Sequence, residues 1–371
     1  SENKQKNILG EMFSDEITDM VGALDEEESK EVLEKIDEDE RKDVQKLLNY
    51  DPDTAGGIMA TEFVSIRENK SIGETLKYLQ KEAPDAESVY YLYVVDKMDI
   101  LKGVVSLRDI VCTQFDTKIS DITNNNVISV KYDVDQEEVA NIFEKYGFLS
   151  MPVVNENNKL LGMVTADDIM EVLKDESTED IHRLGGIDKE EKVDGTLSES
   201  IKSRLPWLVI NLITAILAAS VVGAFEGTIS QVVSLATFMP IVAGMGGNAG
   251  TQSLTIIVRG IALGELTGEN AWRIFFKELL VGLTTGVAIG AIICGLGYIW
   301  ERNMIFGIVI GIAMILNMMA ATTSGFIVPV VLKKLKVDPA LASAVFVTTV
   351  TDVLGFFFFL GLATMFIQYL I

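Results

Sequence analysis

The pattern of hydrophobic positions along this chain changes near residue 205. Beyond it, four stretches carry no charged residue, namely 206–225, 227–258, 279–300 and 303–332. A fifth, 339–371, holds a single charge, Asp352. Each stretch provides the roughly 18–20 residues that cross a hydrocarbon core about 30 Å thick. The pattern predicts an α-helical membrane domain at 206–371 with five transmembrane helices, at about 206–226, 229–259, 273–300, 304–332 and 339–370.

Basic residues beside these segments predict their orientation. Lys202 and Arg204 precede the first helix, and basic groups also flank the connections between helices two and three and between helices four and five. In the other two connections, between helices one and two and between helices three and four, Arg302 is the only basic residue. By the positive-inside rule, we expect the N-terminal half in the cytoplasm and the C-terminus outside a cytoplasmic membrane.

The first half contains an internal repeat. Val94–Ile110 and Val153–Ile169 align without a gap, and each reads as a strand, a turn, a second strand and a helix that begins at Ser/Thr-x-x-Asp. Two more short strands, Phe63–Ile66 and Val127–Val130, are followed by helices near 71–82 and 135–146. Self-similarity at a fixed spacing indicates two copies of one α/β unit, which we place at 51–175.

This repeat resembles a tandem CBS domain. Ser106-x-x-Asp109 and Thr165-x-x-Asp168 stand where that family places contacts to ribose and phosphate. A hydroxyl and a carboxylate at a helix start can bind a sugar diol and a phosphate. The same residues are also favoured helix N-caps, so capping alone is the alternative.

Residues 1–50 form a short all-α segment ahead of the repeat. We expect two or three helices between residues 8 and 50, with an acidic run from Asp25 that is typical of a solvated helix surface. The segment is too short to bury much core alone, so it is predicted to dock on its neighbour. The N-terminus shows no basic stretch followed by an apolar run, so no cleavable signal peptide is expected.

Charge is segregated in the same way as hydropathy. The net charge is −23, while residues 206–371 contain seven basic and seven acidic residues, so the excess lies in the first half. An acidic chain lacks the basic patches that bind nucleic acid. Cys112 and Cys294 lie far apart in the sequence and match no spacing of zinc ligands or redox cysteines. The chain has one histidine, His182, so catalysis by imidazole groups is not favoured. The sequence outside the membrane segments shows no pattern of a nucleophile beside a general base, so an enzyme is the weakest interpretation.

Two features of the membrane half predict an ion pathway. Asp352 lies in the middle of the last apolar segment, where a carboxylate is costly unless it faces water, a cation or a partner group. In the second segment, the run from Pro240 to Ser253 is rich in glycine, which permits a broken helix whose carbonyls contact an ion together with Asn248 and Gln252. The alternatives are a structural Asp352 and close helix packing through small residues.

Acidic residues also gather between the two halves. Asp168 and Glu171 are spaced i, i+3, and Glu176, Glu179 and Asp180 are spaced i, i+3, i+4, so each set shares one helical face. Like charges so placed are destabilising without a counter-ion. Hard oxygen ligands without His or Cys suit Mg²⁺ or Ca²⁺. An exposed acidic helix is the alternative.

Taken in order, these parts resemble the MgtE-type magnesium channels and transporters. The resemblance is carried by Tyr50-Asp-Pro-Asp-Thr-Ala-Gly-Gly-Ile-Met, Thr178-Glu-Asp-Ile-His-Arg-Leu-Gly, Gly246-Gly-Asn-Ala-Gly-Thr-Gln-Ser, Val337-Asp-Pro-Ala and Thr351-Asp-Val. It spans nearly the whole chain, although the N-terminal helical domain looks shorter than the usual form.

The resemblance implies a homodimer in the lipid bilayer with a central pore from helices two and five. Asp352 of each subunit would hold Mg²⁺, with Thr348, Asn248 and Gln252 lining the pore. It implies regulatory Mg²⁺ among eight carboxylates: Asp135, Glu137, Asp168, Glu171, Glu176, Glu179, Asp180 and Asp338. It further implies ATP as a ligand of the CBS pair, with Thr165 and Asp168 as contacts, and a plug or connecting helix region at 176–205.

These observations predict a magnesium channel that cytosolic Mg²⁺ closes. Repulsion between acidic cytoplasmic halves would hold the channel open, and bridging cations would remove that repulsion. Three alternatives stay open: a secondary transporter that exchanges Mg²⁺ for Na⁺ or H⁺, a channel for other divalent cations such as Co²⁺ or Mn²⁺, and a membrane-anchored nucleotide sensor without transport.

Overall fold

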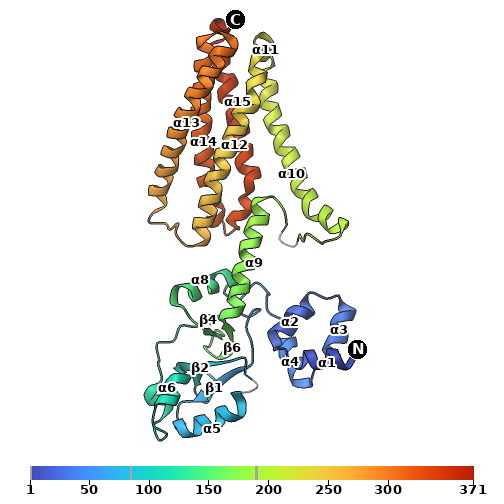
Figure 1. Cartoon of the computed structure of the whole chain (residues 1–371), viewed down its shortest axis with the longest axis vertical. Coiled ribbons are helices and arrows are strands. Elements are labelled where there is room, and N and C mark those ends of the chain that lie inside the picture. The colour runs from blue at the N-terminus through green and yellow to red at the C-terminus, as the bar shows by residue number, and fades with distance from the viewer. Residues whose placement is uncertain (1, 84–85, 189–190) are drawn as a thin grey trace. The chain divides into compact units, whose positions relative to one another are not determined.

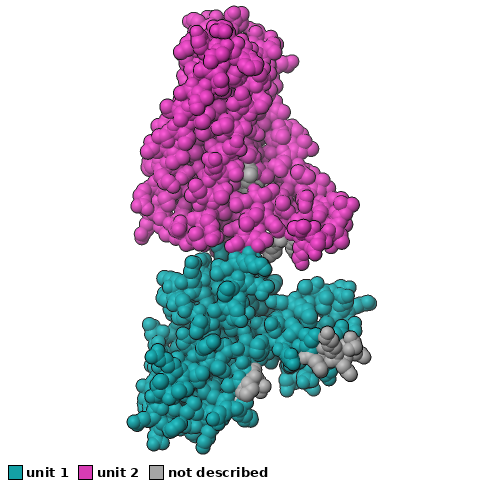
Figure 2. Space-filling model, in the orientation of Figure 1, with its two compact units in different colours: residues 1–176 teal, residues 177–371 magenta. Residues whose placement is uncertain are grey.

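The computed structural model describes residues 2–83, 86–188 and 191–371, which fall into two compact units, 1–176 and 177–371 (Figures 1 and 2). The first unit combines short helices with two small sheets, and the second is made of long helices. The predicted class, an N-terminal helical segment, a tandem CBS domain and a helical C-terminal region, is confirmed.

Four helices open the first unit: α1 (Glu2–Leu9), α2 (Ser14–Gly22), α3 (Glu26–Lys35) and α4 (Glu38–Leu47). They share a small core that includes Ile17, Val21 and Val44. The acidic run is largely a solvated surface, as expected, and Asp25 caps α3 by accepting hydrogen bonds from two backbone N–H groups. The segment packs on its neighbour, since Leu47 belongs to the core of the second CBS repeat.

The two CBS repeats have the same topology. The first contains β1 (Phe63–Arg67), α5 (Ile72–Glu82), β2 (Ser88–Val95), β3 (Leu101–Ser106) and α6 (Leu107–Cys112), and a short helix α7 (Ile119–Ile122) follows. The second contains β4 (Val130–Lys131), α8 (Gln136–Tyr146), β5 (Ser150–Val154), β6 (Leu160–Thr165) and α9 (Ala166–Leu184). In each sheet, the first strand is parallel to the second, and the third is antiparallel to it.

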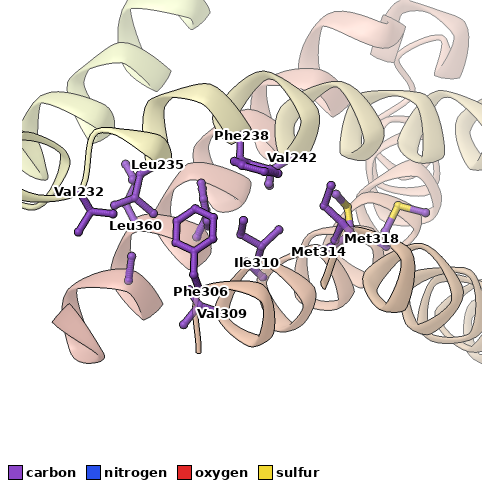
Figure 3. Packing of buried hydrophobic residues seen from close by; sticks show 14 of the residues in the cluster. Val232, Leu235, Phe238, Val242, Phe306, Val309, Ile310, Met314, Met318 and Leu360 are labelled. Carbon is purple, nitrogen blue, oxygen red and sulfur yellow. The ribbon is translucent and has the colours of Figure 1, made fainter. Parts of the chain in front are cut away.

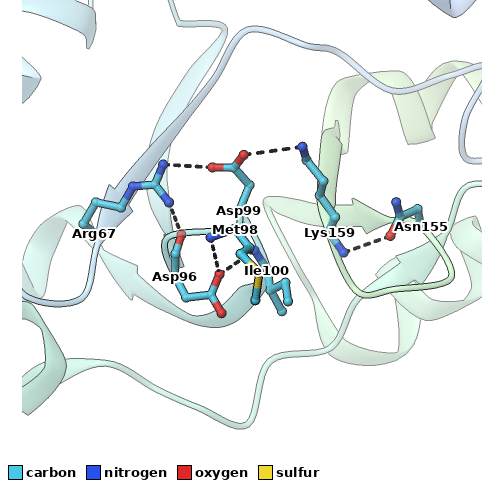
Figure 4. Close-up of polar contacts among 7 residues, drawn as sticks. All are labelled: Arg67, Asp96, Met98, Asp99, Ile100, Asn155 and Lys159. Carbon is cyan, nitrogen blue, oxygen red and sulfur yellow. Dashed lines mark hydrogen bonds and ion pairs between the residues drawn. The ribbon is translucent and has the colours of Figure 1, made fainter.

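The repeats meet through two equivalent hairpin turns (Figure 4). Asp99 and Asn158 both adopt positive φ, at 61° and 59°. Each turn accepts a backbone hydrogen bond from a strand of the other repeat. The Leu101 N–H donates to the Asn158 carbonyl at 2.9 Å, and the Leu160 N–H donates to the Asp99 carbonyl at 3.1 Å. The Asp99 carboxylate lies 2.9 Å from Arg67 and 3.4 Å from Lys159, so ion pairs reinforce the junction.

The second unit contains α10 (Leu197–Ala224), α11 (Glu226–Gln231), α12 (Ser234–Ala262), α13 (Ala271–Glu301), α14 (Met304–Lys334), the 3₁₀ turn η2 (Pro339–Ala342), α15 (Ser343–Met365) and α16 (Ile367–Leu370). Helix α14 is the centre of the bundle, because α12, α13 and α15 all pack against it. Phe238, Ile310 and Met314 lie in its apolar core (Figure 3). Glycines let α13 and α14 approach closely, and a Cβ at Gly290 would lie 2.8 Å from the Gly311 carbonyl oxygen.

The helix boundaries differ from the predicted ones at two places. Helix α10 begins nine residues before position 206, because Thr196 and Glu199 form a capping box there, and Pro206 lies inside the helix. The predicted helix at 339–370 is divided into η2, α15 and α16. Helix α9 ends at Leu184, just before Gly186 with a φ of +69°, and α10 begins at Leu197, so the described part of the region 176–205 contains the end of one helix and the start of another.

Four helices in the described part of the chain are long and apolar enough to cross a membrane: α10, α13, α14 and residues Val345–Met365 of α15. Five such helices were predicted. The fifth, α12, has 29 residues but is not among the four, since glycine and the polar side chains of Asn248 and Gln252 lower its mean hydropathy. It nevertheless packs along α14 and α15 as a full-length member of the bundle.

Candidate functional site

The strongest candidate site in the first unit is a cluster of three carboxylates. Asp15 on α2, Glu87 before β2 and Asp168 on the first turn of α9 place ligand oxygens within 4.8 Å of one another. Asp15 is buried, and the other two residues are partly buried. Hydrogen bonds from Ser14 to Glu62, at 3.0 Å from N–H and 2.8 Å from the hydroxyl, hold α2 in place beside the CBS repeats.

The cluster holds its carboxyl groups far from their ordinary titration range. Burial, followed by the charge of Asp168, raises the pKa of Asp15 to about 7. Burial, followed by the charges of Asp15 and Asp168, raises the pKa of Glu87 to about 8. One turn along α2, burial and the charge of Glu171 raise the pKa of Asp19 to about 6. Burial and mutual repulsion therefore favour the protonated form of these carboxyl groups near neutral pH, and a bound cation would favour the ionised form.

Two oxygen atoms of the cluster have no hydrogen-bond partner among the described residues. They are Asp15 Oδ1 and Glu87 Oε2, and both are buried. Buried oxygens of this kind are costly unless a donor or a cation satisfies them. Three hard oxygen donors without nitrogen or sulfur fit Mg²⁺ or Ca²⁺. The sequence singled out Asp168 and Glu171, but it missed Asp15 and Glu87, which come from distant segments without a motif.

The remaining predicted regulatory carboxylates lie elsewhere. Asp135 caps α8 by accepting a hydrogen bond from the Glu137 N–H at 2.9 Å, and the next residue, Gln136, donates to Glu176 at 2.6 Å. These acidic residues therefore gather where α8 begins beside the middle of α9. They form a second group within the first unit.

The third acidic group belongs to the second unit and already contains a cation. Arg183 at the end of α9 forms ion pairs with Glu179 and Asp338. Burial raises the pKa of the neighbouring Asp180, and Arg259 opposes that effect. Glu179 and Asp338, which were predicted as Mg²⁺ ligands, are thus brought together, with a guanidinium between them.

Asp352 lies on α15 and is half-buried. Among the described residues, no hydrogen bond or ion pair to its carboxylate is found, and it is the one charged side chain in the sequence of α15. Nearby, α12 and α15 are in close contact through glycine. A Cβ at Gly247 would lie 3.6 Å from Thr348, and one at Gly250 would lie 2.5 Å from Val347.

Asn248 and Gln252 point away from this contact. Both are exposed on α12 at spacing i, i+4, whereas Ala249 and Gly250 between them are buried. The glycine-rich run is a continuous helix from Ser234 to Ala262, so the predicted break does not occur. Its glycines serve close packing, and its two amide side chains form a polar stripe on the outer face of the bundle.

The CBS pair carries a cavity of about 370 Å³ on one side. Tyr91, Tyr146 and Phe148 are among its lining residues, and the rings of Tyr146 and Phe148 are stacked with centroids 5.4 Å apart. Ser106 pairs with Tyr91 in the sheet, so the Ser106-x-x-Asp109 helix start lies beside this cavity. Thr165 instead donates hydrogen bonds to Asp168 within the carboxylate cluster, where negative charge disfavours a phosphate.

Comparison with known proteins gives three family matches along the chain. Residues 1–53 match the MgtE intracellular N domain, residues 55–113 and 119–175 match the CBS domain, and residues 239–362 match MgtE, described as a divalent cation transporter.

Individual relatives match over most of the chain. It is 40% identical over 327 residues to the magnesium transporter MgtE of Enterococcus faecalis, covering 88% of this chain and 72% of the relative. It is 39% identical over 326 residues to the magnesium transporter MgtE of Thermus thermophilus, covering 87% and 72%. A crystal structure of the cytosolic domain of the Mg²⁺ channel MgtE in complex with ATP is 40% identical, covers 45% of this chain and 69% of that one, and has a TM-score of 0.44.

Proposed function

This chain belongs to the MgtE family of magnesium transporters, and we propose that it carries Mg²⁺ across the cytoplasmic membrane along a path beside Asp352. The observation that carries the proposal is the Asp352 carboxylate, half-buried in an apolar helix without a protein partner among the described residues. An intramembrane carboxylate in that position is stabilised by a passing cation or by water. Mg²⁺ releases its water reluctantly, so contact through its hydration shell is expected.

We propose that the path lies between two copies of the chain. Asn248 and Gln252 are exposed on α12 although they lie in a membrane helix, and polar side chains in contact with lipid are unfavourable. A second copy placed against this face would enclose a polar lining made of both stripes. The resemblance to the family suggests in addition that the two Asp352 carboxylates, with Thr348 on the same helix, line this path. The N-terminal half would lie in the cytoplasm and the C-terminus outside.

The cytoplasmic carboxylates would act as the Mg²⁺ sensor. At low Mg²⁺, repulsion among Asp15, Glu87 and Asp168 opposes the contact of α2 with α9. Mg²⁺ bound there neutralises the cluster and holds the two helices together. We propose that a change at the first turn of α9 is passed along this helix, which is continuous from Ala166 to Leu184. High internal Mg²⁺ would thereby close the path.

Reconstitution in liposomes tests this function. Mg²⁺ flux should be strong at low internal Mg²⁺ and fall as internal Mg²⁺ rises. Asp352→Asn should abolish selective flux, while Glu269→Gln, a change in the exposed loop before α13, should leave it unchanged. Persistent selective Mg²⁺ flux in Asp352→Asn would show that the path does not pass Asp352. Co²⁺ and Mn²⁺ in the same assay determine the selectivity.

A second candidate function is regulation by a nucleotide such as ATP. The aromatic cavity of the CBS pair supports it, because Tyr91, Tyr146 and Phe148 line the cavity and can stack on a base. Ser106, which pairs with Tyr91 in the sheet, lies beside it. The geometry favours this side over Thr165 and Asp168. Calorimetric titration with ATP tests it, and the absence of binding to the full-length protein would contradict it.

A further inference from the structure

The second unit contains another acidic residue within a membrane span, Glu278 on the second turn of α13. Its exposed fraction is 3%, so it is more deeply buried than Asp352. It does not belong to the α12–α15 contact. A charged carboxylate at such a position requires compensation, and acidic residues within membrane helices typically mark an ion site.

The Glu278 carboxylate has one buried and one exposed polar partner. Ser253 Oγ on α12 donates a hydrogen bond of 2.6 Å to Oε2. Lys277 Nζ lies 3.3 Å from Oε1, but the Lys277 side chain is 61% exposed, whereas the Glu278 side chain is 4% exposed. The buried anion is therefore paired with a long side chain that lies mostly in solvent or lipid headgroups. Such an ion pair is weak and can open without disturbing the helix packing.

Glu278 also faces a cavity of about 350 Å³ between α12, α13 and α14. Oxygen-bearing side chains from all three helices line it, namely Gln252, Ser253, Glu278, Thr285 and Thr322. Its volume corresponds to about ten water molecules. Gly282 is required here because a Cβ would overlap the Thr322 hydroxyl. Six apolar side chains also line the cavity, so the oxygen-bearing groups form a local set around Glu278.

We propose that this cavity is a binding site for an alkali metal cation, Na⁺ or K⁺, with Glu278 as its charged ligand. The inference deepens the proposed transport function, because Gln252 belongs both to this cavity and to the polar stripe of α12. Hydroxyl, amide and carboxylate oxygens are the ligands that hard cations prefer. One carboxylate balances one monovalent charge, whereas a divalent ion would leave a net positive charge within the membrane.

Lys277 is the competitor of the bound ion in this arrangement. When the cavity is empty, its ammonium group neutralises Glu278. When an alkali cation enters, Lys277 moves outward, where its side chain already lies. Removal of the Lys277 charge should therefore strengthen cation binding, although it removes the salt bridge. A purely structural ion pair predicts no such gain.

The test is a cation titration of the full chain in detergent, without Mg²⁺ and at constant ionic strength. The thermal unfolding midpoint should rise and saturate with Na⁺ or K⁺ in exchange for choline, because a ligand that binds the folded state stabilises it. Glu278→Gln should abolish the rise. Lys277→Gln should lower the half-saturating concentration by about fivefold, the upper range for a half-exposed ion pair. Glu269→Gln is the matched control and should titrate like the wild type.

Three results would overturn the site: equal midpoints in choline and in alkali chloride, an unchanged titration in Glu278→Gln, or a Lys277→Gln variant whose half-saturating concentration does not fall. If Glu278→Gln fails to fold, the Lys277→Gln titration decides alone. Mg²⁺ flux is measured separately in liposomes with opposed Na⁺ gradients. Cation binding without Mg²⁺ flux would reject the transport function and keep the site. Flux that follows the Na⁺ gradient would make the site part of an exchanger.

Discussion

Replacing Asp15 with asparagine should make α2 more firmly bound in metal-free solution and insensitive to Mg²⁺. Two ionised carboxylates 4.8 Å apart repel by about 3.5 kcal/mol at an effective dielectric constant of 20. The rise in the pKa of Asp15 from 3.8 to about 7, caused first by burial and then by the charge of Asp168, corresponds to roughly 4 kcal/mol. The asparagine side chain carries no charge, so most of this cost disappears above pH 7 in the Asp15→Asn variant.

The sign of the pH dependence follows from the same shift. When folding raises the pKa of a carboxyl group, the folded state binds the proton more tightly than the unfolded state, so protonation stabilises the fold. Its stability contribution is complete below about pH 4 and is lost as the pH rises through about 7 for Asp15 and about 8 for Glu87. Metal-free wild type should therefore lose stability between pH 4 and 8, and added Mg²⁺ should restore it.

Hydrogen exchange of α2 amides in the full-length protein measures this effect. At pH 8 without divalent ions, exchange of α2 in Asp15→Asn should be roughly 300-fold slower than in the wild type after correction for intrinsic rates, since about 3.5 kcal/mol is 2.5 powers of ten. Mg²⁺ should slow the exchange in the wild type alone. Glu27→Gln on the exposed face of α3 is the control and should behave like the wild type. Faster metal-free exchange in Asp15→Asn, or equal protection of both proteins by Mg²⁺, would refute the reasoning.

Three further outcomes are expected. Gly282→Ala should lower the thermal unfolding midpoint, by about 1–3 kcal/mol in stability, because its Cβ overlaps Thr322, and Thr322→Ala should recover part of the loss. Arg183→Gln should shift flux inhibition to lower internal Mg²⁺ in liposomes, because it frees the carboxylate of Asp338, and an unchanged inhibition curve would argue against that competition. Tyr146→Ala should weaken calorimetric ATP binding by about 1–3 kcal/mol if a base stacks in the CBS cavity.

Local patterns predicted the elements of this fold, because hydropathy windows and a gapless repeat are properties of neighbouring residues. The repeat predicted a turn in each copy, and the structure places Asp99 and Asn158 there, both with positive φ. The carboxylate cluster was only partly predictable. Asp168 stood in a visible acidic set, but Asp15 and Glu87 are single residues whose importance arises when α2 docks on the CBS pair. The sequence did not single out Glu278 either, because its burial arises only when α12 and α14 pack around it.

The acidic groups of this chain differ in whether a basic side chain of the protein lies beside them. Arg183 and Lys277 carry fixed positive charges that any incoming ion must displace, so Asp338 and Glu278 are partly neutralised before an ion arrives. Among the described residues, the causes of the raised pKa values of Asp15 and Glu87 are burial and neighbouring carboxylates, and no basic side chain is among them. The proposed sensor role therefore rests on a cluster whose charge would depend directly on solution Mg²⁺. This dependence is the physical property that a Mg²⁺ sensor requires, and it follows from the absence of a tethered competitor rather than from the number of acidic residues.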